Sequence, residues 1–335
     1  MVLVESYPIA VMLCFVTMLC WGSWANTQKL ATKEWKFQLF YWDYSIGVLL
    51  FSLIFAFTLG SIGSQGSSFV SNISQAAPKL LFYAFLGGVI FNLSNILLVV
   101  AIEIAGMAVA FPVGVGLALV IGVVTNYKPA DSNAILLFLG VGCVSAAIII
   151  DGLAYKKLLQ GSGQKTPMKG IIISILAGIL MGGFYRFVAT SISSDFVTIE
   201  PGKLTPYSAV VLFSFGLFMS SFIWNTINMA KPLSGGEPAT YKEYFTMGNL
   251  KLHLIGILGG IIWNIGMSLN ILAAGKASFA ISYGLGQGAT LIAACWGVFI
   301  WKEFKNSPKG TNPMLALMFA LYVVGLALII IARVV

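Results

Sequence analysis

An acid inside an apolar segment can carry a proton across a membrane, and Asp43 is the acid placed most deeply in an apolar part of this sequence. It lies in the run FYWDYSIG, about one and a half turns into a predicted helix. An acid partly removed from water can load and release a proton near neutral pH. We therefore predict Asp43 as a proton-coupling residue. The alternative is a structural ion pair with Lys29 or Lys33 at the membrane surface.

Uncharged polar side chains recur on single faces of the apolar blocks. The pairs at helical spacing are Asn92 with Asn95, Asn264 with Ser268, and Tyr283 with Gln287. Polar groups at membrane depth are costly and usually face the interior of a helix bundle. Amide and hydroxyl groups can exchange hydrogen bonds with a neutral polar solute and hold no fixed charge for an ion. These residues are predicted to bind solute, or alternatively to join helices by hydrogen bonds.

Aromatic residues in the first apolar block add a flat surface. Trp21, Trp24 and Gln28 share one face of the predicted helix. Indole rings above an amide can stack on a sugar face or a planar heterocycle. The alternative is a belt of Trp residues at the membrane interface. The depth of Trp21 in its block favours the cavity.

These residues must be positioned by helices that cross a membrane. Of the 335 residues, 59% are hydrophobic and only 9% are charged, whereas soluble domains have about 25% charged residues. A span needs about 20 mostly apolar residues. Such blocks lie near 8–28, 38–60, 80–103, 107–126, 134–154, 170–190, 206–229, 251–273, 278–301 and 313–334. The sequence predicts an all-α integral membrane protein.

The distribution of positive charge predicts the orientation. Most of the 19 Lys and Arg residues flank connections on one side, near 29–36, 156–169, 231–251 and 302–309. Cytoplasmic connections carry the positive excess. Both termini are therefore expected outside the cytoplasm and the 155–169 linker inside it. The net charge of +8 is attributed to orientation and not to a nucleic-acid partner.

The two halves of the chain are related. Residues 86–119 align without gaps on residues 258–291, and LGGVIFNLSN in the first segment matches LGGIIWNIGM in the second. An odd number of helices per repeat inverts the second copy, and such inverted repeats underlie alternating access in many carriers. We predict a first five-helix repeat at 1–154, a cytoplasmic linker at 155–169 and a second repeat at 170–335.

Helix-breaking residues occupy matching places in the repeats. Pro112 and Gly114 lie in the fourth block, and Gly284 and Gly286 lie in the ninth. They are predicted hinges, or alternatively small residues that let helices approach closely.

The sequence has no pattern of a catalytic, metal or cofactor site. Glu103, Asp151 and Glu303 lie near predicted helix ends and are interpreted as markers of the membrane interface. The four cysteines lie inside apolar blocks without metal-ligand spacing. We expect no enzyme activity, no metal and no cofactor.

Three segments resemble the ureide permeases: CWGSWANTQKL at 20–30, FYWDYSIGVLLFSLIFAFTLGSIG at 40–63 and GLGQGATLIAACWGVFIWKEFKNS at 284–307. The resemblance covers both halves and matches Trp21, Trp24, Asp43, Gln287 and Trp296 by position. It implies membership of the drug/metabolite transporter superfamily, with ten helices in a five-plus-five inverted repeat. The bacterial glucose/ribose porters are neighbours of this family.

The resemblance implies a proton-linked importer of allantoin, uracil or related oxo-purines, and its neighbours imply ribose or glucose as alternatives. The expected partners are a small neutral polar solute, protons and membrane lipid, without nucleic acid, and a homodimer is compatible with the sequence. The expected location is a bacterial inner membrane or a plasma membrane. A facilitator without coupling, and a structural or assembly subunit that moves no solute, are the remaining alternatives.

Overall fold

The computed structural model describes residues 1–31, 34–158 and 167–335, and within these ranges the regular secondary structure is helical apart from one isolated bridge between Ile192 and Leu204. The helices are α1 (Tyr7–Ser23), α2 (Ala25–Ala31), α3 (Phe37–Phe57), α4 (Phe69–Gln75), α5 (Pro78–Ala105), α6 (Met107–Asn126), α7 (Ala134–Leu158), α8 (Met168–Ser191), α9 (Pro206–Ala230), α10 (Tyr241–Met247), α11 (Leu250–Ala277), α12 (Phe279–Gly286), α13 (Ala289–Cys295), the π-helical η1 (Trp296–Ile300) and α14 (Thr311–Ile331).

Among the described residues, 10 helical segments are long and apolar enough to cross a membrane, which confirms the predicted spans. The first span combines α1 with α2, and the ninth combines α12, α13 and η1. The short helices α4 and α10 lie in the connections between predicted spans. Part of the predicted linker, 159–166, lies outside the described residues, and α7 continues to Leu158, beyond the predicted end at 154.

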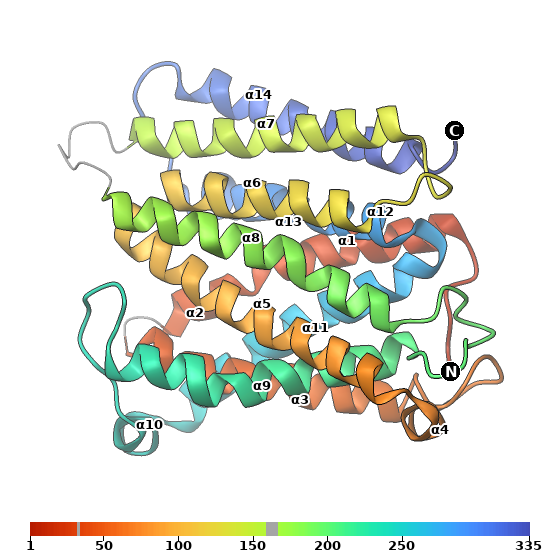
Figure 1. Cartoon of the computed structure of the whole chain (residues 1–335). Coiled ribbons are helices and arrows are strands. Elements are labelled where there is room, and N and C mark those ends of the chain that lie inside the picture. Colours follow the sequence, from red (N-terminus) through yellow and green to blue (C-terminus); the bar gives the residue numbers. More distant parts are fainter. Residues whose placement is uncertain (32–33, 159–166) are drawn as a thin grey trace.

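The spans form a layered bundle (Figure 1). Helices α7 and α14 pack together on one side of the bundle, and α3 and α9 lie on the opposite side. The remaining spans lie between these two pairs. Both termini lie at the same end of the bundle, which is also the end that carries α4, whereas α10 lies at the other end.

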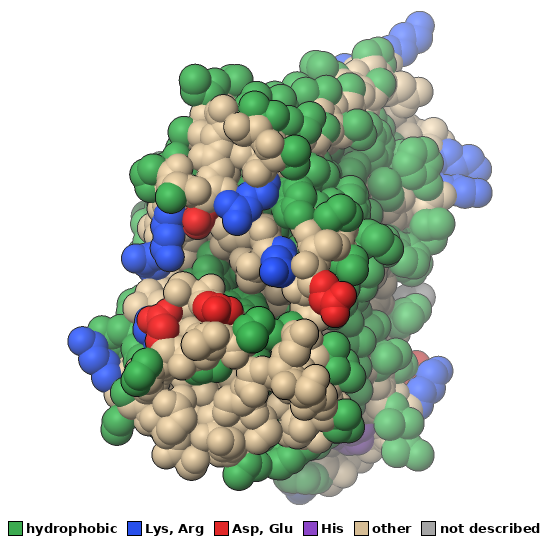
Figure 2. Space-filling view, turned by 90° about the vertical axis from the view of Figure 1, so that its right-hand side faces the viewer, with side chains coloured by type: hydrophobic (Ala, Val, Ile, Leu, Met, Phe, Trp, Pro, Cys, Tyr) green, Lys and Arg blue, Asp and Glu red, His purple; other side chains and the backbone are tan. Residues whose placement is uncertain are grey.

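The surface has charged side chains at its end and apolar side chains along its flanks, as a protein in a bilayer requires. Figure 2 looks onto the end that carries the termini, where acidic and basic side chains lie across the surface and hydrophobic side chains cover much of the flank. Along the flanks, large apolar side chains such as Leu19, Ile54 and Val323 are exposed. In a protein of this composition these side chains contact lipid and not water.

Matching contacts relate the two halves. Helix α5 packs against α9, and its repeat counterpart α11 packs against α3. In the first pair the Asn92 side-chain Nδ2 donates to the Leu217 carbonyl at 3.0 Å. In the second pair the equivalent Asn264 Nδ2 donates to the Val48 carbonyl at 2.6 Å. Each helix pair is therefore joined by the same hydrogen bond.

The backbone conformation after the third span is also the same in the two halves. Gly106, between α5 and α6, has φ 76° and ψ 158°, and the equivalent Ser278, between α11 and α12, has φ 77° and ψ 158°. Positive φ is uncommon for a residue with a side chain. Ser278 also caps α12, because its side-chain oxygen accepts from the Ile281 N–H at 3.5 Å. The same bend therefore follows the third span of each half.

Candidate functional site

A cavity of about 540 Å³ lies between the two halves. This volume lies within the range of pockets for small molecules. Its walls come from α1, α2, α5 to α8, α11 and the segment from Gln287 to Glu303. The cavity begins at Trp21 and Trp263 in the middle of the bundle and continues to Lys29 and Glu103 at the end opposite the termini.

Aromatic rings form the inner end of the cavity. Phe91 and Trp263 occupy equivalent positions in the repeat, and their ring centroids lie 4.5 Å apart. The Trp21 ring stacks on Trp263 with a centroid separation of 5.9 Å and an interplanar angle of 13°. Trp21 Nε1 donates to the Trp263 carbonyl at 3.1 Å. The inner end is thus a flat aromatic surface where the two repeats meet.

Two glycines leave the space that the Trp21 ring occupies. A Cβ added at Gly266 would lie 2.6 Å from Trp21 Cδ1, and one added at Gly286 would lie 2.8 Å from Trp21 Cζ3. Gly286 also ends α12, and Gln287 and Gly288 form a turn before α13. The predicted hinge at Gly286 thus coincides with a break in the ninth span.

The other predicted hinges lie inside continuous helices. Pro112 and Gly114 lie within α6, and Gly284 lies within α12. A Cβ added at Gly178 of α8 would come within 2.6 Å of the Gly114 carbonyl oxygen. The Gly114 backbone therefore packs closely on α8, and the hinge role of these three residues stays a prediction.

Neutral amides lie beside the aromatic surface. Asn95 Nδ2 donates to the Tyr41 hydroxyl at 3.2 Å, and the Asn95 side chain lines the cavity. Gln287 lines it from the break between α12 and α13 and is 8% exposed. A carboxamide offers both a donor and an acceptor. The inner end can therefore pair with a solute that has carbonyl and N–H groups.

The structure brings five of the predicted solute-binding residues to this cavity: Trp21, Trp24, Gln28, Asn95 and Gln287. The other predicted solute-binding residues, Asn92, Asn264, Ser268 and Tyr283, are buried outside its lining.

Three of these residues outside the lining join helices. Asn92 joins α5 to the Leu217 carbonyl of α9, and Asn264 joins α11 to the Val48 carbonyl of α3. Tyr283 donates its hydroxyl to the Met181 carbonyl of α8 at 3.1 Å. Their contacts correspond to the alternative of hydrogen bonding between helices.

Charged side chains surround the outer part of the cavity. Lys29 Nζ lies 2.8 Å from Glu303 Oε1, and Tyr155 donates its hydroxyl to Glu303 Oε2 at 2.7 Å. Glu103 and Asp151 line the same cavity. The sequence analysis interpreted these acids as markers of the membrane interface. It did not predict that they line the cavity. The signal that could have found Asp151 is its position inside a helix that extends further than the apolar block.

Glu303 lies just beyond the ninth span and has a perturbed pKa. Burial acts to raise the pKa of Glu303, but hydrogen bonds from Lys29 and Tyr155 and the charge of Lys29 outweigh burial and lower it. The stabilisation that ionised Glu303 provides is therefore fully present above the pKa of an unfolded glutamate, about 4.3. It is lost as the pH falls through the lower folded-state pKa.

We expect Glu303→Gln to lower the free energy of unfolding by about 0.5–1 kcal/mol at neutral pH, because this ion pair is partly exposed. The difference from wild type should shrink as the pH falls below about 4.3. Thermal unfolding in detergent across this range measures it. A difference that stays constant with pH would contradict the assignment.

Asp43 lies outside the cavity, in a separate hydrogen-bonded cluster. It is 1% exposed and accepts from the Tyr244 hydroxyl at 2.5 Å and from Trp35 Nε1 at 3.3 Å. His253 Nδ1 lies 2.9 Å from Asp43 Oδ1. Lys29, one of the two expected ion-pair partners of Asp43, pairs with Glu303 instead, and the other, Lys33, lies outside the described residues.

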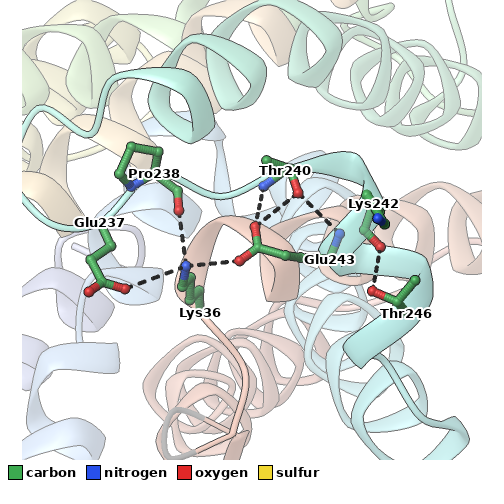
Figure 3. Close-up of polar contacts among 7 residues, drawn as sticks. All are labelled: Lys36, Glu237, Pro238, Thr240, Lys242, Glu243 and Thr246. Atoms are coloured by element: carbon green, nitrogen blue, oxygen red, sulfur yellow. Dashed lines mark hydrogen bonds and ion pairs between the residues drawn. The ribbon is translucent and has the colours of Figure 1, made fainter.

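Helix α10 brings Tyr244 to Asp43 and is itself fixed by polar contacts (Figure 3). Lys36 binds the Pro238 carbonyl at 2.9 Å and Glu243 at 3.2 Å, and Thr240 and Glu243 form a capping box. The backbone hydrogen bond from Thr240 and the contact with Lys36 lower the pKa of Glu243. Burial and the hydrogen bond to Asp43 raise the pKa of Tyr244.

The bundle is closed at the end that carries the termini. Tyr185 of α8 donates its hydroxyl to Asn270 Oδ1 of α11 at 2.6 Å, and Asn270 Nδ2 donates to the Ser282 carbonyl of α12 at 2.6 Å. All three residues are buried. The cavity is therefore separated from the side of the termini by a hydrogen-bonded layer across three helices.

Comparison with known proteins agrees with this architecture. The sequence model of the family described as Ureide permease matches residues 40–162 and 151–332. The chain belongs to the ureide permease family. It is a multi-pass membrane transporter, and most of its cavity lining falls within the matched residues.

Relatives within the ureide permease family align over nearly the whole chain. Ureide permease 1 of Arabidopsis thaliana is 23% identical, with 98% of each chain covered. Probable ureide permease A3 of Vigna unguiculata is 22% identical, with 92% of this chain and 99% of the relative covered. A solved crystal structure matches with a TM-score of 0.57 and 14% identity over 97% of both chains, which shows a shared fold.

Proposed function

We propose that this permease is a proton-coupled secondary transporter that imports a small neutral polar solute of the ureide or nucleobase type. The observation that carries the proposal is the inner end of the cavity, where the stacked Trp21 and Trp263 rings lie beside the amides of Asn95 and Gln287. Oxo-purines and uracil have planar rings, the hydantoin ring of allantoin is nearly planar, and all of them carry carbonyl and N–H groups. Aromatic faces and carboxamides complement these features.

The position of the cavity supports an alternating mechanism. The cavity lies between two repeats that make equivalent contacts, and it reaches only one end of the bundle. Exchange of the roles of the repeats would open the other end around the same solute. The Lys-rich connections lie at the end that the cavity reaches, so we assign this end to the cytoplasm and the termini to the opposite side.

Proton coupling makes the import active. Asp43, predicted from the sequence, lies outside the cavity. Its protonation could act on the solute only through a movement of α3 or α11, which carry Asp43 and its neighbour His253. The coupling role of Asp43 stays a prediction.

The test is uptake into proteoliposomes that contain only the purified protein, with an imposed inward proton gradient. Radiolabelled allantoin, uracil, ribose and glucose are compared. We expect accumulation of allantoin or uracil above equilibrium, and loss of this accumulation when the gradient is collapsed. Uptake of ribose or glucose alone would show that the solute is a monosaccharide and not a ureide or nucleobase. No uptake of any of the four would contradict the transport function.

A further inference from the structure

Asp151 is a buried acid on the wall of the cavity. It lies on α7, about 10 Å before the end of this helix at Leu158. The residue is 6% exposed and lines the cavity. Its Oδ1 atom is buried and has no hydrogen-bond partner among the described residues. An ionised carboxylate without a partner is costly at a buried position.

Few charges face Asp151 from the elements around it. Tyr155 lies one turn further along α7 and binds Glu303, whose charge is near enough to act on Asp151. Tyr322 of α14 is close enough for an electrostatic interaction with Asp151, and its hydroxyl interacts with the Thr290 side chain. The titratable or charged residues that line the same cavity are Lys29, Glu103, Asp151, Tyr155 and Glu303. From α6 and α13 the lining contains only uncharged residues.

Lys29, the cation of the cavity lining, already has a partner. Its Nζ atom pairs with Glu303 at 2.8 Å and lies 4.1 Å from the centroid of the Trp301 ring. The Glu303 carboxylate therefore lies between Lys29 and Tyr155, and it adds negative charge on the side of Asp151. A second negative charge on Asp151 would be opposed by Glu303.

Asp43 differs from Asp151 in the hydrogen-bond partners of its carboxylate. Both of its carboxylate oxygens have partners: Tyr244 binds Oδ1, Trp35 binds Oδ2, and His253 lies within hydrogen-bond distance of both. Its charge is therefore satisfied inside the protein. A carboxylate held by three donors has less reason to exchange its proton in each transport cycle than one on the cavity wall with an oxygen that has no hydrogen-bond partner in the described part of the chain.

Resting on the proposed function, we propose that Asp151 binds the transported proton and that its neutral carboxyl group donates a hydrogen bond to a carbonyl oxygen of the solute. Ionised, the carboxylate only accepts hydrogen bonds, and it cannot pair with a carbonyl oxygen. Solute in the cavity also displaces the water that would solvate the charge. Proton binding and solute binding therefore favour each other, and this coupling is reciprocal.

The order of events follows from the closed end of the bundle. Proton and solute enter together when the cavity faces the termini. They leave together after the cavity opens toward Lys29 and Glu103, as in this structure. Water that re-enters the empty cavity then solvates the ionised Asp151.

Asp151→Asn tests the proposal, because asparagine keeps a donor for the solute but cannot release a proton. Two assays are run on the same proteoliposomes: exchange of labelled for unlabelled solute without a gradient, and entry of protons on solute addition, read by a pH dye inside the vesicles. We expect Asp151→Asn to retain exchange, to lose proton entry and to lose accumulation above equilibrium. The pH dependence of exchange should flatten.

Glu103→Gln is the matched control, because it removes an exposed acid from the same cavity, and it should retain proton entry with the solute. Asp43→Asn removes the buried acid outside the cavity that the sequence predicted for coupling, and it therefore compares the two candidate proton sites. We expect Asp43→Asn to retain proton entry, because Asp151 then binds the transported proton. Asp151→Glu keeps a titratable group and should keep proton entry with a shifted pH dependence. This variant also tests whether residue 151 is the proton site if Asp151→Asn does not fold.

The outcomes separate this inference from the proposed function. If wild type accumulates solute and Asp151→Asn does so equally, or if only Asp43→Asn loses proton entry, Asp151 is not the proton site. An unchanged pH dependence in Asp151→Glu would also overturn the proposal. If wild type moves no solute at all, the proposed function itself fails.

Discussion

Gln287→Leu is expected to lower the apparent affinity for the transported solute about 10- to 100-fold, while the protein stays folded. The amide lines the inner end of the cavity from the break between α12 and α13. A solute group that loses its buried partner costs about 1–3 kcal/mol. The change is measured as the KM of uptake into proteoliposomes, with size-exclusion chromatography as the check on folding.

Gln38→Leu is the matched control. Gln38 is also 8% exposed, but it lies on α3 outside the cavity lining. It should leave the KM close to that of wild type. Equal effects of the two substitutions would indicate that Gln287 acts on the stability of the bundle and not on the solute.

Gly88→Val and Gly260→Val are expected to prevent formation of the folded protein. A Cβ at Gly88 would lie 1.9 Å from the Phe213 carbonyl oxygen, and one at the equivalent Gly260 would lie 2.0 Å from the Tyr44 carbonyl oxygen. The clash is with backbone, so a change of rotamer cannot relieve it. Overpacking of side chains costs about 1–3 kcal/mol, and separation of two helices in contact costs more because every neighbouring contact along them is weakened.

The measurement is the yield of monodisperse protein after extraction in a mild detergent. Gly142→Val is the control, because no atom of another helix among the described residues lies within 4 Å of a Cβ added at Gly142. It should give protein at close to the wild-type yield. Folded Gly88→Val protein would contradict the close contact between Gly88 of α5 and the Phe213 backbone of α9.

The spans and the repeat could be predicted because each rests on a local property of the sequence. Apolar length gave the ten spans, and the aligned segments 86–119 and 258–291 correspond to helices with equivalent contacts. The same alignment places Phe91 over Trp263. The contact between these two rings could therefore have been expected from the repeat.

The division of polar residues between cavity and helix contacts could not be predicted. Asn92 and Asn95 lie one turn apart, yet Asn92 binds α9 and Asn95 lines the cavity. Both positions face the interior of the bundle, so helical periodicity does not separate them. The partners of Asp43 could not be predicted from the sequence either, because Tyr244 and His253 are about 200 residues away along the chain.

Solute protection of a single cysteine in the cavity tests the central claim most directly. In a variant whose four native cysteines are replaced, Ala293→Cys lies in the cavity lining, and Glu237→Cys lies in the connection between α9 and α11, where the native side chain is 90% exposed. Each is labelled with a small thiol reagent with and without the transported solute. We predict that the solute slows labelling at position 293 and leaves labelling at position 237 unchanged. Equal labelling of position 293 with and without solute would contradict binding in this cavity.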